Sequence, residues 1–230
     1  MDLTLYPDLL KKNSARKGSL FLKRIIDIIG AVFALIIFSP LLIIIPLIIK
    51  LTSKGPVLFT QTRIGREGKA FTFLKFRSMY AGNDEKIHAE YVKKLILEGK
   101  AYSGKEAEPG ETVYKIKDDP RITPFGKLLR KTSMDELPQF INVLKGEMSL
   151  VGPRPPIPYE IESYDVWHWR RILDCRPGIT GLWQVKGRSR TNFNDMVRLD
   201  IRYIKEWSIW LDLKLLIKTP WTLLSSKGAY

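Results

Sequence analysis

The feature that most constrains this chain is an apolar block near its N-terminus. Residues 28–49 carry no charged side chain, and these 22 residues would form a straight helix of roughly 33 Å at about 1.5 Å per residue. This length is enough to cross a bilayer core. It exceeds the apolar stretch of a cleavable signal peptide, typically about 7 to 15 residues, and no A-x-A-like site follows. The sequence therefore predicts a membrane segment that stays in the protein.

Two features argue against a plain crossing by this block. Ser39 and Pro40 fall near its middle, where proline removes a backbone donor and clashes with the preceding turn. The flanks are basic on both sides, which gives the positive-inside rule no clear orientation; these residues are Lys17, Lys23, Arg24, Lys50 and Lys54. A re-entrant helix broken at Ser39-Pro40 satisfies both observations. A kinked helix that crosses once satisfies the length, so the residues alone leave both topologies open.

Charge and cysteine content narrow the class of partner. The chain has 38 Lys and Arg against 24 Asp and Glu, a formal charge of +14, which indicates nucleic acid, anionic lipid or phosphorylated small molecules as partners. The single cysteine, Cys175, excludes an internal disulfide. With only His88 and His168 no histidine-rich zinc site can form, and both are interpreted as surface or structural residues. Any metal is expected to be bound through oxygen ligands.

The remainder of the chain predicts a mixture of strands and helices. Residues 56–61 and 71–76 are typical of strands, and the glycine-containing segment 65–69 between them predicts a hairpin. Helices are predicted at residues 84–98, 123–131, 159–174, 193–207 and 211–224, with a further helix that ends at Gly146 and a short strand at 148–151. Prolines at 153, 155 and 156 predict a rigid loop that fixes the direction of Arg154. We therefore expect an α+β fold.

This pattern divides the chain into three parts. Residues 1–19 form a basic tail, residues 20–51 the membrane helix, and residues 52–230 a polar domain, which contains every candidate for a catalytic site. The last two predicted helices carry Trp207, Trp210 and Trp221 among lysines, which suits helices lying in a membrane interface. Ordinary docking on the protein core explains each tryptophan equally well.

Asp135 and Glu136 form the most unusual pair in this basic chain. Ser133 followed by Glu136 matches a capping box, although Pro138 fits a helix better if Asp135 is the N-cap. Either way, we expect both acids at the positive end of a helix dipole, which favours their ionised forms. An ionised aspartate can attack phosphorus, and Glu136 can bind Mg²⁺ if the surrounding cations hold phosphates. Capping and chemistry both remain open from these residues.

Several cations lie beside predicted turns or strand ends, where side chains converge on sites. Arg130 precedes the acid pair by about one helical turn and is a candidate for a second phosphate. The others are Lys75, Arg77, Arg154, Arg176 and Arg188. Each alone is more simply a solvated surface cation, and only their grouping with glycine and proline favours a binding role.

Taken together, these segments resemble the bacterial sugar transferase family, the monotopic polyprenyl-phosphate phosphoglycosyl transferases. The likeness runs from about residue 20 to the C-terminus, and its motifs occur in the same order. They are residues 54–57, 61–65, 75–79, 132–139, 149–155 and 176–185. Residues 1–19 stand where larger members carry a transmembrane bundle and a further domain, so the chain resembles the minimal catalytic form.

The resemblance implies an enzyme on the cytoplasmic face of the bacterial inner membrane. It would transfer a sugar 1-phosphate from a UDP-sugar to undecaprenyl phosphate, release UMP, and begin the synthesis of a surface glycan. By this likeness Asp135 is the nucleophile, Glu136 binds Mg²⁺, Arg130 contacts the lipid phosphate, and Arg154 closes over the nucleotide. Ser39-Pro40 matches the family's helix break and implies a re-entrant segment. The positions within nucleotide-sugar-binding motifs are Lys75, Arg77, Arg154, Arg176, Gln184 and Arg188.

The competing interpretation is a membrane-tethered basic domain that binds anionic lipid or nucleic acid, in which the two acids only cap a helix. The resemblance favours an enzyme without a nucleic-acid partner. The sequence does not decide which sugar is transferred, or whether the chain forms a homo-oligomer.

Overall fold

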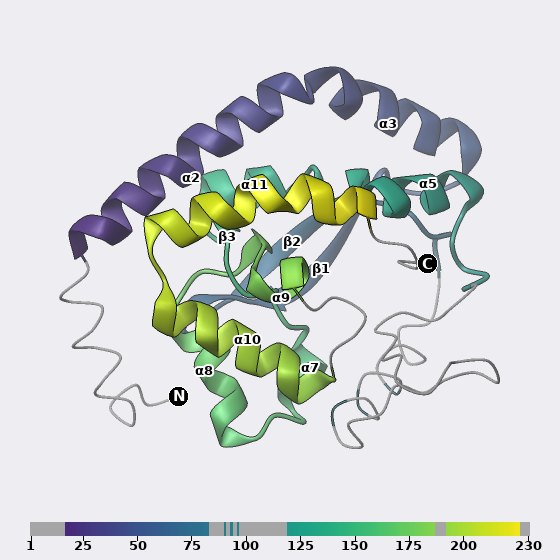
Figure 1. Ribbon diagram of the computed structural model, residues 1–230. Helices are drawn as coiled ribbons and strands as arrows, with labels where there is room; N and C mark the ends of the chain where they lie inside the picture. Colours follow the sequence, from purple (N-terminus) through teal and green to yellow (C-terminus); the bar gives the residue numbers. More distant parts are fainter. Residues whose placement is uncertain are drawn as a thin grey trace.

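The computed structural model describes residues 17–82, 90, 93, 96, 119–186 and 192–225, and the predicted α+β class is confirmed (Figure 1). The longer elements are α2 (Lys17–Ile37), α3 (Ser39–Thr52), β1 (Leu58–Ile64), β2 (Ala70–Phe76), α5 (Pro124–Thr132), α6 (Gln139–Lys145), α10 (Phe193–Glu206) and α11 (Ile209–Ser225). The shorter ones are η2 (Arg66–Gly68), η3 (Met134–Glu136), β3 (Ser149–Val151), α7 (Pro158–Ile161), η4 (Val166–Trp169), α8 (Arg170–Leu173), β4 (Gly178–Thr180) and α9 (Leu182–Lys186).

The apolar block forms two helices that meet at a bend of 60°. The predicted break at Ser39-Pro40 is confirmed, because α2 ends at Ile37 and α3 begins at Ser39. Ser39 Oγ donates to the carbonyl of Ile36 at 2.7 Å, and Pro40 lies in the first turn of α3, where a missing N–H costs little. Among the described residues no single helix is long and apolar enough to cross a membrane, whereas the bent pair together meets that criterion.

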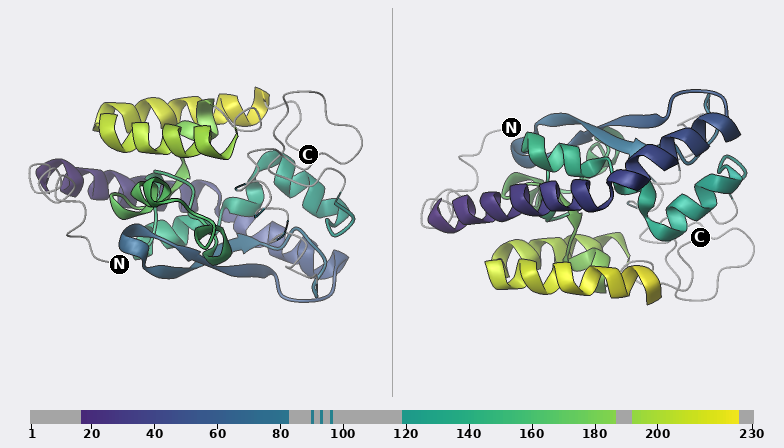
Figure 2. Two further views of the ribbon diagram at one scale, coloured as in Figure 1. Left: turned by 90° about the horizontal axis from the view of Figure 1, so that it is seen from below. Right: turned by 90° about the horizontal axis from the view of Figure 1, so that it is seen from above.

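The first arm of the bent pair, α2, lies along the rest of the protein (Figures 1 and 2). A Cβ atom at Gly30 would lie 2.5 Å from Leu150 Cδ1, so glycine allows α2 to approach β3 closely. Asp27 is buried and accepts from Leu150 N–H and Ser149 Oγ, both at 2.9 Å. Arg24 donates to the carbonyls of residues 143 and 144 near the end of α6. Arg24 and Asp27 of α2 are therefore bound to the folded domain.

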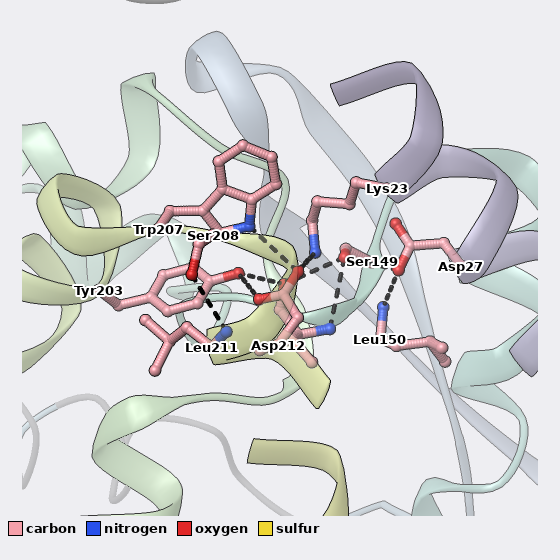
Figure 3. A network of polar contacts seen from close by, with 10 residues as sticks. Lys23, Asp27, Ser149, Leu150, Tyr203, Trp207, Ser208, Leu211 and Asp212 are labelled. Atoms are coloured by element: carbon pink, nitrogen blue, oxygen red, sulfur yellow. Dashed lines mark hydrogen bonds and ion pairs between the residues drawn. The ribbon is translucent and has the colours of Figure 1, made fainter. Parts of the chain in front are cut away.

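A buried polar network joins α2 to the C-terminal helices (Figure 3). Lys23 Nζ lies 2.6 Å from Asp212 Oδ2 and donates to the Val151 carbonyl at 3.1 Å. Tyr203 OH also donates to Asp212 and Val151, at 2.7 and 3.0 Å, and Trp207 Nε1 donates to Asp212 at 3.0 Å. Because Asp212 is shielded from water, these donors keep its charge compensated.

The second arm, α3, packs on the same body. Ile45 and Ile49 are buried in a cluster with Phe76, Leu129 and Leu137, which come from β2, α5 and the turn before α6. Away from these contacts the bent pair exposes large apolar side chains. These include Phe21, Ile29, Phe33, Ile36, Ile37, Ile43, Leu47 and Leu51. Both arms thus contact one domain while an apolar surface faces outward.

Two small sheets organise the domain. The predicted hairpin is confirmed: β1 pairs antiparallel with β2, with Arg63 opposite Phe71 and Phe59 opposite Lys75. Strand β3, which confirms the strand predicted at 148–151, pairs parallel with β4, so that Ser149 lies beside Gly178. Sheet β3-β4 lies between α2 and the C-terminal helix pair (Figure 1).

One helix prediction is wrong. Residues 159–174 form the separate turns α7, η4 and α8 instead of one helix. The reason is a capping box: Asp165 N–H donates to His168 Nδ1 at 3.0 Å, while the Asp165 side chain accepts from the backbone of His168, which restarts the helix at Val166. His168 Nε2 pairs with Asn194 Oδ1 at 2.9 Å, and burial lowers the pKa of His168, as expected for a structural histidine.

The C-terminal helices predicted at 193–207 and 211–224 are confirmed as α10 and α11. Trp210 and Trp221 on α11 are exposed, at 71% and 72%, whereas Trp207 is half-buried against Asp212. The predicted helix at 84–98 lies outside the described residues except at positions 90, 93 and 96, which are helical. The predicted N-terminal tail, up to residue 16, also lies outside them.

We predict that Lys23→Met lowers the free energy of unfolding by about 3 to 5 kcal/mol, because it leaves Asp212 buried without its cation. Denaturant unfolding of the detergent-solubilised protein measures this. Lys50→Met, at an exposed position of the same helix pair, is the matched control and should change little. Equal losses in the two variants would contradict the prediction.

Candidate active site

Asp135 and Glu136 lie in η3, a tight turn between α5 and α6. The predicted caps are wrong: Ser133 adopts a left-handed conformation (φ 55°, ψ 20°) and is the C-cap of α5, and its side chain caps neither helix. Helix α6 begins only at Gln139, after Pro138, so neither acid caps it. The α6 helix does end at Gly146, with φ 83°, as predicted. The turn places the carboxylates between two helices, where they do not serve as N-caps.

Lys75 holds this acid pair from the neighbouring strand. Its Nζ lies 2.7 Å from Glu136 Oε1 and 3.4 Å from Asp135 Oδ2. Asp135 is only 5% exposed, whereas Glu136 is half-buried. A buried carboxylate beside an ammonium group is stabilised in its ionised form. The structure therefore combines the predicted residues Asp135, Glu136 and Lys75 in one charged cluster.

Arg130 approaches the cluster from the last turn of α5. Its Nε donates to Ser78 Oγ at 2.9 Å, which orients the guanidinium group. Gly126 makes this packing of α5 feasible, because a Cβ atom there would lie 1.9 Å from the Ser78 carbonyl. Arg130 lies in the last turn of α5, and the left-handed turn at Ser133 separates it from the two acids.

The loop with Arg154 is fixed first by sheet β3-β4. Gly152 N–H donates to the Thr180 carbonyl and Gly178 N–H to the Pro153 carbonyl, each at 2.8 Å. A Cβ atom at Gly178 would lie 2.0 Å from Gly152 N, so glycine is required for this approach. The Arg154 side chain is exposed. Its backbone is thus held while its guanidinium remains accessible.

Two arginines fix the same loop from other elements. Arg63 Nη1 donates to the Pro155 carbonyl at 2.9 Å, and the adjacent Ile64 N–H donates to the Pro156 carbonyl at 3.0 Å. Arg171 Nη2 donates to the Arg154 carbonyl at 3.1 Å and pairs with Asp200 at 2.7 Å. Sequence reasoning assigned no role to Arg63 or Arg171. Arg63 lies within the motif at 61–65, but no residue pattern indicated that its side chain is buried.

Other predicted cations lie elsewhere. Arg77 is buried and donates to the Ser53 and Lys54 carbonyls, so it connects β2 to the segment after α3. Arg176 Nε donates to the Gly146 carbonyl at 2.8 Å, at the C-terminal end of α6. Burial, with Arg66 and Arg24 nearby, lowers the pKa of Arg176.

Gln184 and the Gly152 carbonyl, at the start of the loop that carries Arg154, both lie against Gly181. A Cβ atom at Gly181 would be 2.7 Å from Gln184 Oε1 and 2.3 Å from the Gly152 carbonyl. Gln184 Oε1 is buried and accepts no hydrogen bond from the described residues. Arg188 falls outside the described residues. Ligand contacts of all these side chains stay predictions.

The acid pair also bears on the predicted Mg²⁺. The described residues contain no group of three or more His, Cys, Asp or Glu side chains suited to a metal. Mg²⁺ in phosphate chemistry is commonly bound by one or two carboxylates together with substrate phosphates and water. The adjacent Asp135 and Glu136, both of which already face a cation, fit that arrangement.

Lys75 pairs with the buried Asp135 and the half-buried Glu136, and this charged cluster is the candidate active site. Residues 18–226 match the family model described as bacterial sugar transferase. The chain belongs to this family.

Named relatives show the same likeness. The chain is 47% identical over 212 residues, 91% of its length, to galactosyl transferase CpsE of Streptococcus agalactiae serotype III, and covers 44% of that protein. It is 44% identical over 224 residues, 96% of its length, to undecaprenyl-phosphate galactose phosphotransferase of Salmonella typhimurium, again 44% of the relative. It is 39% identical over 211 residues, 90% of its length, to exopolysaccharide production protein ExoY of Rhizobium meliloti, and covers 88% of it. The chain thus spans less than half of the first two relatives.

We predict that Lys75→Met lowers the free energy of unfolding by about 1.5 to 3 kcal/mol, since it removes charge-assisted hydrogen bonds from a half-buried acid pair. Denaturant unfolding measures this. Lys69→Met, an exposed lysine of the same hairpin, should have almost no effect. In a Glu136→Gln background, Lys75→Met should lower the free energy of unfolding by less than it does in the wild type. If the losses of the two single variants simply add in the double variant, a direct interaction is contradicted.

Proposed function

We propose that this chain transfers a sugar 1-phosphate from a UDP-sugar to undecaprenyl phosphate, releases UMP, and begins the synthesis of a surface glycan. The observation that carries the proposal is the buried Asp135 carboxylate, held by Lys75 beside Glu136. The names of the relatives supply the substrate classes, sugar phosphate and undecaprenyl phosphate. The absence of a capping role for both acids weighs against the non-catalytic alternative.

The first half-reaction is nucleophilic substitution at phosphorus. A carboxylate oxygen of Asp135 attacks the β-phosphorus of the UDP-sugar and forms an acyl phosphate. The bond from that phosphorus to the bridging oxygen breaks, and UMP leaves with the electron pair. Lys75 keeps Asp135 ionised and oriented. Mg²⁺, bound through Glu136, would supply positive charge to the diphosphate.

The second half-reaction returns the carboxylate. A phosphate oxygen of undecaprenyl phosphate attacks the phosphorus of the acyl phosphate, and the bond to Asp135 breaks. The product is a polyprenyl diphosphate sugar. Arg130, oriented by Ser78, is the cation that we assign to the lipid phosphate. Its position on α5, which packs against α3, favours access from the membrane side.

The membrane arrangement proposed with this function is re-entrant, on the cytoplasmic face of the inner membrane. The supporting observation is that both arms of the bent pair contact one folded domain: α2 through Lys23, Arg24 and Asp27, and α3 through Ile45 and Ile49. A chain that crossed the bilayer once would place its arms on opposite sides. Trp210 and Trp221 on exposed positions of α11 suit contact with the interface.

The chemical step is tested by intact-protein mass spectrometry. Incubation with a UDP-sugar and Mg²⁺, without lipid acceptor, should add the mass of one phosphosugar to the protein and release UMP. Undecaprenyl phosphate should remove the adduct. Because the sugar is not assigned, a panel of UDP-sugars is used.

Asp135→Asn is the informative variant, since it keeps the shape of the side chain and removes the nucleophile. An adduct that persists in Asp135→Asn would refute the nucleophile. The matched control is Asp195→Asn, an acid on α10 that pairs with Arg198 and should form the adduct normally. Absence of UMP release with every sugar of the panel would refute the proposed function.

The topology gives a separate prediction. In a Cys175→Ser background, Gly18→Cys and Thr52→Cys place thiols at exposed positions near the two ends of the bent pair. Both should resist a membrane-impermeant thiol reagent in spheroplasts and react after permeabilisation. Arg198→Cys on α10 is the cytoplasmic control. Labelling of one end alone from outside would establish a crossing and refute the re-entrant arrangement.

A further inference from the structure

One face of the hairpin carries a row of side chains from the acid pair to the Arg154 loop. Lys75 Nζ, which contacts both acids, lies 5.7 Å from the centre of the Phe73 ring. The Arg63 guanidinium carbon lies 5.1 Å from the same ring. Arg63 is opposite Phe71, and alternation in β2 puts residues 71, 73 and 75 on one face. The row therefore connects Asp135 and Glu136 with the loop that Arg63 holds.

Among the described residues, Arg63 and Arg77 are both buried without a carboxylate partner, but Arg77 donates through both terminal nitrogens to Ser53 and Lys54. Arg63 has fewer hydrogen-bond partners. It is 5% exposed, and its charge has no carboxylate within ion-pair distance in the described part of the chain. Arg171, equally shielded, pairs with Asp200 at 2.7 Å. Nη1 of Arg63 donates to Pro155, while Nε and Nη2 donate to no acceptor among the described residues. A cation left in this state is costly unless a ligand supplies the anion.

The charges around Arg63 strengthen this interpretation. Burial, followed by the positive charge of Arg154, lowers the pKa of Arg63 to about 10, and Glu160, Tyr159 and Glu136 act in the opposite direction. Arg63 and Arg154 thus lie close enough to repel each other. Two adjacent guanidinium groups with free donors match the oxygens of a phosphate or diphosphate.

We propose that Arg63 is a second phosphate-binding residue, which contacts phosphoryl oxygens of the nucleotide diphosphate together with Arg154. The inference rests on the proposed function and extends it to a residue outside the predicted site. The soluble diphosphate is the favoured source of the phosphate, because the Arg63 side of the loop leads to α7. That helix lies away from the membrane helices α2 and α3 (Figure 1).

Calorimetry with the detergent-solubilised full chain tests the proposal without turnover. UDP and inorganic pyrophosphate are titrated into the wild type, Arg63→Gln and Arg63→Lys. Loss of charge-assisted hydrogen bonds should weaken UDP binding about 10- to 100-fold in Arg63→Gln. Arg63→Lys keeps the charge but loses the planar donor fork, so a smaller loss is expected. Arg66→Gln, at the hairpin turn beside Glu67, is the matched control and should bind UDP as the wild type does.

A second arm separates the two sources of phosphate. Binding to vesicles with and without undecaprenyl phosphate should be the same for Arg63→Gln and the wild type. Thermal unfolding establishes which variants fold. If Arg63→Gln does not fold, UDP binding by Arg63→Lys tests the role of Arg63. Unchanged UDP binding in a folded variant would overturn the inference, as would a loss confined to the lipid.

This inference and the proposed function fail in distinguishable ways. A wild type that binds UDP through Arg63 but transfers no sugar phosphate refutes the function and supports the phosphate site. An active enzyme whose Arg63 variants bind UDP normally refutes the site and leaves the function. A wild type that binds neither UDP nor pyrophosphate overturns the phosphate site directly.

Discussion

The compensation of three neighbouring charges on the helix α2 controls how this protein is assembled. Lys23, Arg24 and Asp27 lie within two turns of α2, and each is paired with the folded domain: with Asp212, with carbonyls of α6, and with the backbone of β3. Leaving any of them unpaired at the edge of a membrane would be costly. The same pairings fix α2 against the domain, so that the apolar surface of the bent pair faces outward. Charge compensation and the outward direction of the apolar surface are therefore one constraint.

This attachment is continuous with the candidate active site. Val151 accepts hydrogen bonds from Lys23 on α2 and from Tyr203 on α10, and the next residue, Gly152, begins the loop that carries Arg154. The other end of this loop is held by Arg63, which lies on β1 of the hairpin. The second strand of the hairpin, β2, carries Lys75, which pairs with the acids. The path from the membrane helix to the acid pair thus passes through short, well-packed segments. Small displacements of α2 would be transmitted to the loop, because such packing is not readily deformed.

Much of the fold could be predicted because local chemistry determines it. The break at Ser39-Pro40, the hairpin and the end of α6 at Gly146 follow from proline and glycine geometry. The caps around Ser133 could not be predicted, since the left-handed turn there ends one helix instead of beginning another. The helix at 159–174 failed for a related reason: a side chain to backbone exchange between Asp165 and His168 competes with helix continuation.

The sequence singled out the acid pair and Lys75, which the structure brings together, but it could not sort the other cations by their contacts. Arg63 lies on β1 and Arg77 follows β2, yet Arg77 donates through Nη1 and Nη2 to the Lys54 and Ser53 carbonyls, whereas Arg63 donates through Nη1 alone, to the Pro155 carbonyl. Arg176 likewise stabilises the carbonyl at the end of α6. Arginines bound to carbonyls at element ends have a structural role that accounts for their position. Arg63 is buried beside Arg154, and among the described residues no carboxylate forms an ion pair with it. Its hydrogen bond to the Pro155 carbonyl therefore does not balance its charge. Tertiary partners, which sequence spacing does not specify, therefore separate structural from ligand-binding cations in this basic chain, and they select Arg63.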